Sequence, residues 1–266
     1  MQTPPVILSI AGYDPSSGAG VTADVKTAAA LGCYAATCIT AVTVQSTQGV
    51  FRVRALEPEL VSETLARLAD DVEIDAVRIG MLGSGEVAAT VRRFLERRRL
   101  SNVVLDPVIR SSSGAALLDD AGIEAVKAML PLCDVITPNI REAATLAGSD
   151  AVPENADWQT ALPMIRQMAI ALRDLGAGAV VITGGHLNPP NDIVSDEAGE
   201  EVIPGERIES RSTHGTGCAF ATALACRLAM GDQLSQAARA AKAYVRQAIL
   251  SAYPLGKGVG PVNHFR

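Results

Sequence analysis

Short runs of β-branched and other apolar residues alternate along the chain with longer Ala- and Leu-rich segments of helical periodicity. The runs are nearly continuous, which is typical of strands buried on both faces of a parallel sheet. Strands that alternate with helices favour right-handed βαβ crossovers, and therefore an α/β fold with a doubly wound, mostly parallel sheet and helices on both faces. The predicted strands are Val6–Ile10, Cys38–Val44, Val77–Ile79, Val103–Leu105, Val135–Thr137 and Ala179–Thr183.

The pattern changes near the C-terminus. Two long helices, Ala219–Met230 and Ser235–Ala252, follow each other with no clear strand between them, which argues against an eight-fold barrel. The Pro-, Asn- and acid-rich stretch Leu187–Arg211 predicts a hairpin or a surface excursion. No linker or repeat divides the chain, so we expect one domain over residues 1–266. The other predicted helices are Val21–Leu31, Pro58–Asp71, Glu86–Arg98, Glu142–Leu146 and Trp158–Leu175.

The charge balance narrows the functional classes. The chain of 266 residues carries 23 Lys and Arg against 29 Asp and Glu, a formal net charge of −6, and 48% of its residues are hydrophobic. This hydrophobic content does not fit a disordered chain, and mild acidity does not fit a dedicated nucleic-acid binder. A site for an anionic substrate would therefore have to be built locally.

Neither a membrane span nor a disulfide framework is predicted. The uncharged stretch between Thr27 and Phe51 is interrupted by Gly32 and by several Thr, Gln and Ser residues, which are costly to bury in hydrocarbon. No basic segment precedes the short apolar run at the N-terminus, so we expect no secretory signal. The cysteines are odd in number and lack zinc-ligand spacing, which favours free thiols in a reducing cytoplasm; they are Cys33, Cys38, Cys133, Cys218 and Cys226.

Polar or glycine-rich residues follow each of the six predicted strands. In open parallel sheets, ligands bind where the carboxyl ends of the strands meet, so these residues are expected to share one edge. Each by itself can be explained as a turn, because Gly and Pro commonly follow strands. The residues at the six strand ends are the segment 11–20, Gln45, Gly80-Met81, Asp106-Pro107, Pro138-Asn139 with Glu142, and Gly184-Gly185-His186.

The segment Thr213–Cys218 reads Thr-His-Gly-Thr-Gly-Cys and leads directly into a predicted helix. Its two glycines allow a sharp turn that presents backbone N–H groups at the helix N-terminus, where an anion can bind without a cationic side chain. Cys218 would lie in the same positive potential, which is expected to lower the pKa of its thiol. Alternatively, this is a glycine-containing loop that only starts a helix, and Cys218 is a buried, inert thiol.

The usual nucleotide fingerprints are absent, so a nucleotide would be held by another scheme. There is no phosphate-binding loop of the G-x-x-x-x-G-K-[ST] type, no third glycine in dinucleotide spacing after Gly18-Ala19-Gly20, and no G-x-S-x-G elbow. Asp106 and Glu142 could together hold a hydrated Mg²⁺; the alternative for Glu142 is an acid favoured by the dipole at a helix start. Asp24 is expected to face the same edge, His214 to position the loop, and His264 to anchor the C-terminal tail.

Taken together, these segments resemble the hydroxymethylpyrimidine/phosphomethylpyrimidine kinases of thiamine biosynthesis, within the ribokinase-like superfamily. The resemblance spans nearly the whole chain. It rests on IAGYDPSSGAGVTADVKT (10–27), TAVTVQSTQGV (40–50), IGMLGS (79–84), LDPV (105–108), ITPNIREA (136–143), GGH (184–186), THGTGC (213–218) and GKGVGPVNHF (256–265).

The resemblance implies a small-molecule kinase that uses ATP and Mg²⁺, with a homodimer as the expected assembly. The γ-phosphoryl group of ATP would pass to the hydroxymethyl group of an aminopyrimidine, and then to its monophosphate. Gly215, Thr216 and Gly217 would stabilise the transferred group and Cys218 would be the general base. The pyrimidine would contact Gly12, Asp24, Gln45, Met81 and Val108; the nucleotide side would include Asp106, Asn139, Thr183, Gly185 and His214; and Asp106 and Glu142 would hold the metal.

Three positions depart from the pattern of the family. Tyr13 stands where the family commonly has Ser, Thr183 stands where it commonly has Lys, and the segment Ile109–Gly114 (Ile-Arg-Ser-Ser-Ser-Gly) lacks a Lys. We hypothesise that phosphate handling has changed, with Arg110 as a substitute, and that one of the two phosphorylation steps is weakened.

Three other functions remain open on the sequence. A pyridoxal kinase would share the superfamily and a hydroxymethyl group on a heteroaromatic ring. A catalytically idle regulator could keep the fold and bind the same ligand. A hydrolase could use Cys218 with His214, although no third orienting group is evident.

Overall fold

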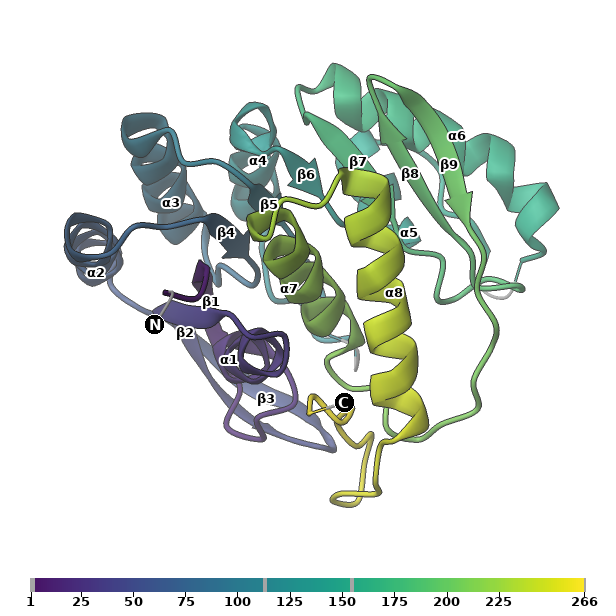
Figure 1. Ribbon diagram of the computed structural model, residues 1–266, viewed down its shortest axis with the longest axis horizontal. Coiled ribbons are helices and arrows are strands. Elements are labelled where there is room, and N and C mark those ends of the chain that lie inside the picture. The colour runs from purple at the N-terminus through teal and green to yellow at the C-terminus, as the bar shows by residue number, and fades with distance from the viewer. Residues whose placement is uncertain (1–2, 112–113, 154–155, 266) are drawn as a thin grey trace.

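The computed structural model describes residues 3–111, 114–153 and 156–265, and within them the chain forms a nine-stranded sheet (Figure 1). The strands are β1 (Val6–Tyr13), β2 (Tyr34–Ser46), β3 (Gly49–Ala55), β4 (Ala76–Ile79), β5 (Val103–Leu105), β6 (Val135–Ile136), β7 (Ala179–Ile182), β8 (Asp192–Asp196) and β9 (Gly199–Ile203). Their order across the sheet is β3-β2-β1-β4-β5-β6-β7-β8-β9.

The six strands from β2 to β7 in this order pair in parallel, whereas β3, β8 and β9 pair antiparallel at the two edges. The predicted α/β fold with a mostly parallel sheet is therefore confirmed. From β1 the chain goes first to β2 on one side and later to β4 on the other. Such a reversal of winding opens a crevice at the carboxyl ends of the two strands that flank it, here β1 and β4.

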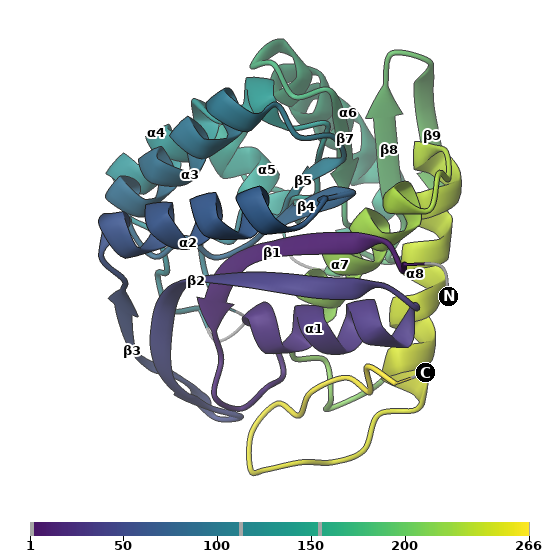
Figure 2. The same ribbon diagram turned by 60° about the vertical axis from the view of Figure 1, so that its left-hand side comes forward.

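Helices cover both faces of this sheet (Figure 2). Neighbouring strand residues point to opposite faces, so that Leu8 packs in one core cluster and Ile7 in the other. Helices α2 to α6 cover the first face, and α1, α7 and α8 cover the second. The helices are α1 (Gly20–Ala30), α2 (Pro58–Asp71), α3 (Gly85–Arg98), α4 (Asp120–Lys127), α5 (Ile140–Ala147), α6 (Trp158–Asp174), α7 (Thr216–Ala229) and α8 (Leu234–Leu250), with a short 3₁₀ turn at Leu130–Leu132.

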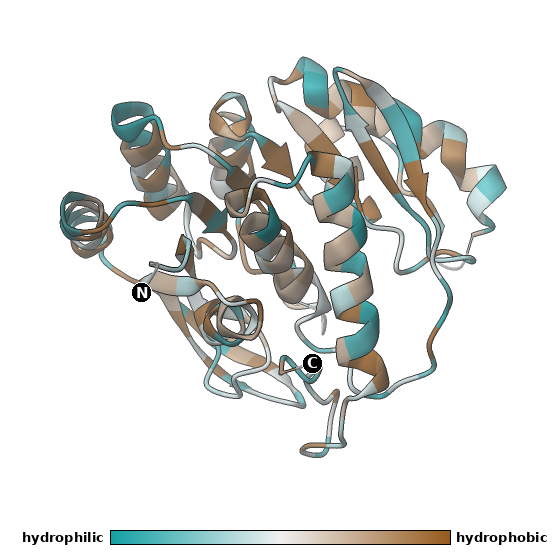
Figure 3. Ribbon diagram, in the orientation of Figure 1, coloured by the Kyte–Doolittle hydropathy of each residue, from teal (hydrophilic) through white to brown (hydrophobic). Residues whose placement is uncertain are grey.

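Hydropathy follows this layering, since apolar strands lie between helices whose outer surfaces carry polar residues (Figure 3). The predicted hairpin in the stretch 187–211 is confirmed as β8–β9, and the two C-terminal helices as α7 and α8. His264 anchors the tail as expected: its ring Nδ1 lies 3.1 Å from the hydroxyl of Thr27, and its carbonyl accepts from Tyr244 at 2.6 Å. No helix within the described residues is long and apolar enough to cross a membrane.

Two elements, β3 and α4, were not predicted. The strand β3 carries Arg52 and Arg54, which break up its apolar pattern because this strand lies at the edge of the sheet. Helix α5 begins two residues before its predicted start, because the Asn139 side chain caps it and the Glu142 carboxylate accepts from the backbone N–H of Asn139. Such a reciprocal capping box satisfies two backbone donors that the first turn would otherwise leave free.

Candidate active site

The carboxyl ends of the parallel strands meet at one edge of the sheet, as predicted. Backbone bonds join the residues just beyond the strands: Gly80 N–H donates to Ile10 at 2.9 Å, and Asp106 N–H donates to Ile79 at 2.8 Å. Further along, Thr183 N–H donates to Pro138 at 3.0 Å. Side chains that are up to about 170 positions apart in the sequence therefore line one continuous edge.

The N-terminus of α7 is open at this edge. Gly215 precedes the helix with φ of 86°, a conformation that favours glycine, and any side chain on it would collide with the carbonyl of Gly18. No side chain caps α7 and its first turn holds no acidic residue, whereas α3 and α5 are capped by Ser84 and Asn139. The free N–H groups of this first turn can therefore bind an anion.

Cys218 lies in that first turn, and its sulfur accepts from the backbone N–H of Gly20 at the start of α1. The expected lowering of its pKa is wrong for the free protein. Burial raises the pKa of the thiol to about 11, and the charges of Asp106 and Asp24 add to the rise, while Arg78 and the Gly20 N–H oppose it. The sequence indicated the helix dipole, which lowers the pKa of the thiol, but not the two carboxylates that the fold places near it. The other four cysteines are buried, and all five are free.

Arg78 is fully buried in β4 and forms two ion pairs beneath the site. Its guanidinium lies 2.7 Å from the carboxylate of Asp106 and 3.2 Å from that of Asp24. The missing side chain of Gly80 makes room for this group, because a Cβ there would collide with it. Sequence reasoning missed Arg78, although a charged residue inside an apolar strand run is a signal that could have indicated it.

Asp24 does not lie on the surface of the site as expected. It is fully buried between α1, α7 and the sheet, where it accepts from Ser9 at 2.6 Å and from Thr222 at 2.7 Å, and pairs with Arg78. Its oxygens are therefore occupied by protein groups, and it supports Arg78 rather than facing a ligand. Burial raises its pKa, and Arg78 and the two hydroxyls limit that rise.

Two carboxyl groups lie close together near the open helix. Burial raises the pKa of Asp106 to about 6, with Arg78 opposing the rise and Asp24 adding to it. Burial likewise raises the pKa of Glu142 to about 8, and the charge of Asp106 contributes. One oxygen of Glu142 accepts from Asn139 N–H at 2.9 Å. A cation between these carboxylates would relieve their repulsion.

Gln45 lies beside His214 of the loop before α7. Its amide group is 3.2 Å from His214 Nε2, and the same ring nitrogen lies 2.8 Å from the carboxylate of Asp14. The prediction that His214 lies on the nucleotide side is therefore wrong. His214 lies beside Gln45, one of the residues predicted to contact the pyrimidine. Asp14, which sequence reasoning also missed, is 3% exposed; burial favours a raised pKa, but bonds from His214 and Ser16 outweigh it and hold the pKa below its usual value.

Three of the predicted substrate residues form an apolar wall at the crevice between β1 and β4. Met81 and Val108 pack in one small cluster with Ala41 and Leu117. A Cβ on Gly12 would come within 3.0 Å of the Met81 sulfur, so glycine keeps this side of the crevice open. Such a wall fits the flat face of an aromatic ring.

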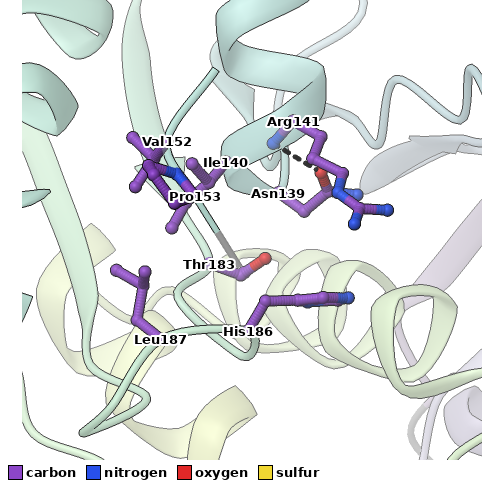
Figure 4. A pocket seen from close by; sticks show the side chains of 8 residues that line it. All are labelled: Asn139, Ile140, Arg141, Val152, Pro153, Thr183, His186 and Leu187. Carbon is purple, nitrogen blue, oxygen red and sulfur yellow. Dashed lines mark hydrogen bonds between the residues drawn. The ribbon is translucent and has the colours of Figure 1, made fainter. Parts of the chain in front are cut away.

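Asn139 and Thr183 share a small pocket between α5 and the loop after β7, which His186 and Arg141 also line (Figure 4). Gly185 lies in the exposed turn beside it. Arg110 is exposed and donates to Gly114 in its own loop at 3.4 Å. Ser112, part of the departing segment, lies outside the described residues.

Residues 14–263 match the sequence model of the family described as phosphomethylpyrimidine kinase. The chain belongs to the phosphomethylpyrimidine kinase family. A hydroxymethylpyrimidine/phosphomethylpyrimidine kinase from Rhizobium meliloti is 42% identical over 265 residues, which cover 98% of this chain and 97% of the relative. The family resemblance expected from the motifs is thus confirmed.

Two other similarities bear on the function of this family member. The thiamine biosynthesis bifunctional protein ThiED of Geobacter sulfurreducens is 40% identical over 97% of this chain, which spans about half (52%) of that relative. The crystal structure of an ADP complex of Bacillus subtilis pyridoxal kinase superimposes with a TM-score of 0.87, at 32% identity and 98% coverage of both chains. The expected ribokinase-like architecture is confirmed by this likeness.

Proposed function

We propose that this phosphomethylpyrimidine kinase family member transfers the γ-phosphoryl group of ATP to the hydroxymethyl group of 4-amino-5-hydroxymethyl-2-methylpyrimidine, and then to the resulting monophosphate. The observation that carries the proposal is the 3.2 Å contact between Gln45 and His214. It puts a side chain suited to an aminopyrimidine beside the loop whose N–H groups suit a phosphoryl group. The name of the Rhizobium meliloti relative supports the same substrate.

The residues at the open end of α7 would supply the chemistry. The backbone N–H groups of Gly217 and Cys218 would stabilise the negative charge on the transferred phosphoryl group. Cys218, as thiolate, would take the proton of the substrate hydroxyl while the new oxygen–phosphorus bond forms and the bond to the ADP oxygen breaks. In the free protein the raised pKa keeps this group a thiol, so thiolate formation belongs to the substrate complex.

Asp106, Glu142 and Asn139 fit a magnesium ion held largely through water. No group of three or more His, Cys, Asp or Glu side chains within the described ranges could hold a metal by itself. Mg²⁺ takes few direct protein ligands when phosphates and waters complete its octahedron, so two neighbouring carboxylates suffice. When bound, the ion would neutralise phosphate charge, and it would offset the Asp106 charge that raises the pKa of Cys218.

Removing one carboxylate of this pair is expected to weaken Mg²⁺ binding in a pH-dependent way. The folded-state pKa of Glu142, about 8, lies above its unfolded value, so the protonated carboxyl stabilises the fold at low pH and this contribution is lost as the pH rises toward 8. Added Mg²⁺ should therefore raise the Tm of the unaltered protein more at pH 8 than at pH 6. In Glu142→Gln this difference should largely vanish, as measured by differential scanning fluorimetry with Ca²⁺-free buffers.

The control for that experiment is Glu124→Gln, which removes an exposed acid of α4 that pairs with Lys127 at 2.9 Å. It should keep the wild-type response to Mg²⁺. An equal Mg²⁺ response in Glu142→Gln and in the wild type would contradict the assignment of Glu142.

A pyridoxal kinase is the second candidate, because the Bacillus subtilis pyridoxal kinase covers the whole fold. Its substrate also carries a hydroxymethyl group on a heteroaromatic ring. A Cys218–His214 hydrolase is disfavoured, since His214 Nε2 is engaged by Asp14 and Gln45. An idle regulator is disfavoured by the open helix terminus with a cysteine in its first turn.

An ATP-dependent assay that offers the aminopyrimidine alcohol, its monophosphate and pyridoxal side by side tests the proposal. We expect the protein to phosphorylate both pyrimidines, each with a higher kcat/KM than pyridoxal. Turnover of pyridoxal alone would establish the second candidate. Comparable turnover of alcohol and monophosphate would remove the hypothesis that phosphate handling has changed, with Arg110 as a substitute, and that one of the two phosphorylation steps is weakened.

Three further expectations stay predictions. They are a single kinase domain over residues 1–266, a homodimeric assembly and a cytoplasmic location. The continuous nine-stranded sheet of the described residues supports the first, and the five free thiols support the last.

A further inference from the structure

The side chain of Gln45 is held from two sides by residues that would not themselves face the substrate ring. The structure places its amide nitrogen 3.2 Å from His214 Nε2 and its amide oxygen 3.2 Å from the hydroxyl of Thr43. The oxygen and nitrogen of an amide have nearly the same shape, so hydrogen bonding decides which of them faces which neighbour.

Asp14 determines which ring nitrogen of His214 carries a hydrogen. The carboxylate of Asp14 accepts from the N–H groups of Ser16, Gly18 and Ala19 and from the Ser16 hydroxyl, at 2.7 to 3.2 Å, and it lies 2.8 Å from His214 Nε2. This buried carboxylate is ionised and can only accept. Nε2 of His214 must therefore carry a hydrogen, whether the ring is neutral or charged.

The hydrogen on His214 Nε2 in turn fixes the orientation of the Gln45 amide. A nitrogen that donates to Asp14 cannot accept from the amino group of Gln45, so hydrogen bonding requires the amide to be turned by half a turn, with its carbonyl oxygen facing His214. The Gln45 amino group then faces Thr43, whose single hydroxyl hydrogen donates to the carbonyl of Tyr13 at 3.0 Å. The Thr43 oxygen is thereby left as an acceptor, every donor meets an acceptor, and the single Nε2 hydrogen of His214 lies between the Asp14 carboxylate and the Gln45 oxygen. The opposite orientation would place two donors against each other at His214, and the Tyr13 carbonyl and the Gln45 oxygen would share the one Thr43 hydrogen.

We propose that His214, held by Asp14, and Thr43 are positioning residues that fix the orientation of the Gln45 amide and so determine which way round the substrate ring binds. The proposal rests on the proposed function. In this orientation Gln45 keeps one free N–H and one free carbonyl lone pair. That pair matches an unprotonated ring nitrogen next to an amino group, as in a 4-aminopyrimidine.

The orientation matters because the edge of the ring is asymmetric. The hydroxymethyl group sits on the carbon beside the amino-bearing carbon, on the side away from the ring nitrogen that Gln45 would contact. Turning the Gln45 amide by half a turn exchanges donor and acceptor, so the ring would have to bind the other way round. With the ring reversed, the hydroxymethyl group would point away from Cys218 instead of toward it.

Equilibrium binding without nucleotide tests this inference. Isothermal titration calorimetry would compare the wild type with Thr43→Val, His214→Ala and the matched control Thr64→Val, whose hydroxyl donates within α2 to Leu60 at 2.8 Å. The titrants are the aminopyrimidine alcohol, an analogue with a 4-oxo group in place of the amino group, and ADP. The 4-oxo analogue reverses the donor and acceptor at that edge.

We expect Thr43→Val and His214→Ala to bind the aminopyrimidine alcohol about tenfold more weakly, since each loses one orienting hydrogen bond. The preference for this alcohol over the 4-oxo analogue should fall by a similar factor, while Thr43→Val and Thr64→Val bind ADP like the wild type. Unchanged binding of the alcohol by Thr43→Val would overturn the inference and leave the proposed function standing. A wild-type protein that binds neither pyrimidine would overturn both.

Discussion

Cys218→Ala is expected to lower kcat for the phosphorylation of the aminopyrimidine alcohol by roughly a hundred- to ten-thousand-fold, the usual contribution of a general base. The side chain stands in the first turn of α7, in contact with the Gly20 N–H and beside Arg78, so its loss removes the proposed proton acceptor. Binding of ADP should change little, because the backbone N–H groups stay in place. Steady-state kinetics at saturating ATP would measure the effect.

Cys133→Ala is the matched control. That thiol is 3% exposed and lies 3.4 Å from the carbonyl of Met129 in the core, so its removal should leave kcat within a few-fold of the wild type. A kcat of Cys218→Ala close to that of the wild type would show that the base is another group.

The pH dependence gives a second readout for the same residue. The base acts when deprotonated, and burial raises the pKa of the thiol in the free protein, so kcat/KM of the wild type should rise with pH. In Cys218→Asp the base is a carboxyl whose ordinary pKa is about 4.6 units lower, so the rising limb should move to lower pH. An unshifted limb would contradict the assignment.

Arg78→Met is expected to lower the free energy of unfolding by about 3–5 kcal/mol at pH 8, the usual effect of removing one partner of a buried ion pair. Methionine fills similar space but leaves the carboxylates of Asp24 and Asp106 buried without their cation. Urea denaturation followed by circular dichroism would measure the loss.

The loss should be smaller at pH 5 than at pH 8. Arg78 is the strongest influence that opposes the rise in pKa of both carboxyls, so without it both pKa values rise further above their unfolded values. A group with a raised folded-state pKa stabilises the fold while protonated and loses that contribution as the pH passes through its folded pKa. The double variant Arg78→Met with Asp24→Asn should regain part of the stability at pH 8. An equal loss at both pH values would refute this account.

Much of the fold was readable from periodicity because buried parallel strands have few alternatives. Runs such as Val103–Leu105 are apolar on both faces, and the sheet buries them on both faces. The predictions failed where an element is half-exposed, as in β3 with its two arginines, or where it is a short helix outside the repeating pattern, as in α4. Edge strands and short helices are stabilised by their neighbours, which local pattern does not show.

The site was only partly readable. The glycines and Cys218 around the start of α7, Gln45 near the end of β2 and the acids after β5 and β6 were identified from their positions at strand and helix ends. Asp14 and Arg78 were missed, although they contact His214 and Asp106. Asp14 and His214 are 200 positions apart in the sequence, and Arg78 and Asp106 are 28 positions apart.

The α/β class, the family and most of the residues at the edge of the sheet could therefore be predicted before the fold was known, because they follow from periodicity, glycine placement and motif order. The charge state and the direction of those groups depend on the folded arrangement. It buries Asp24 beneath the site, brings two carboxylates to Cys218 so that its pKa rises instead of falling, and places His214 against Gln45. The physical reason is that burial and the fields of charged neighbours depend on distances through space, and residues far apart in the chain set those distances.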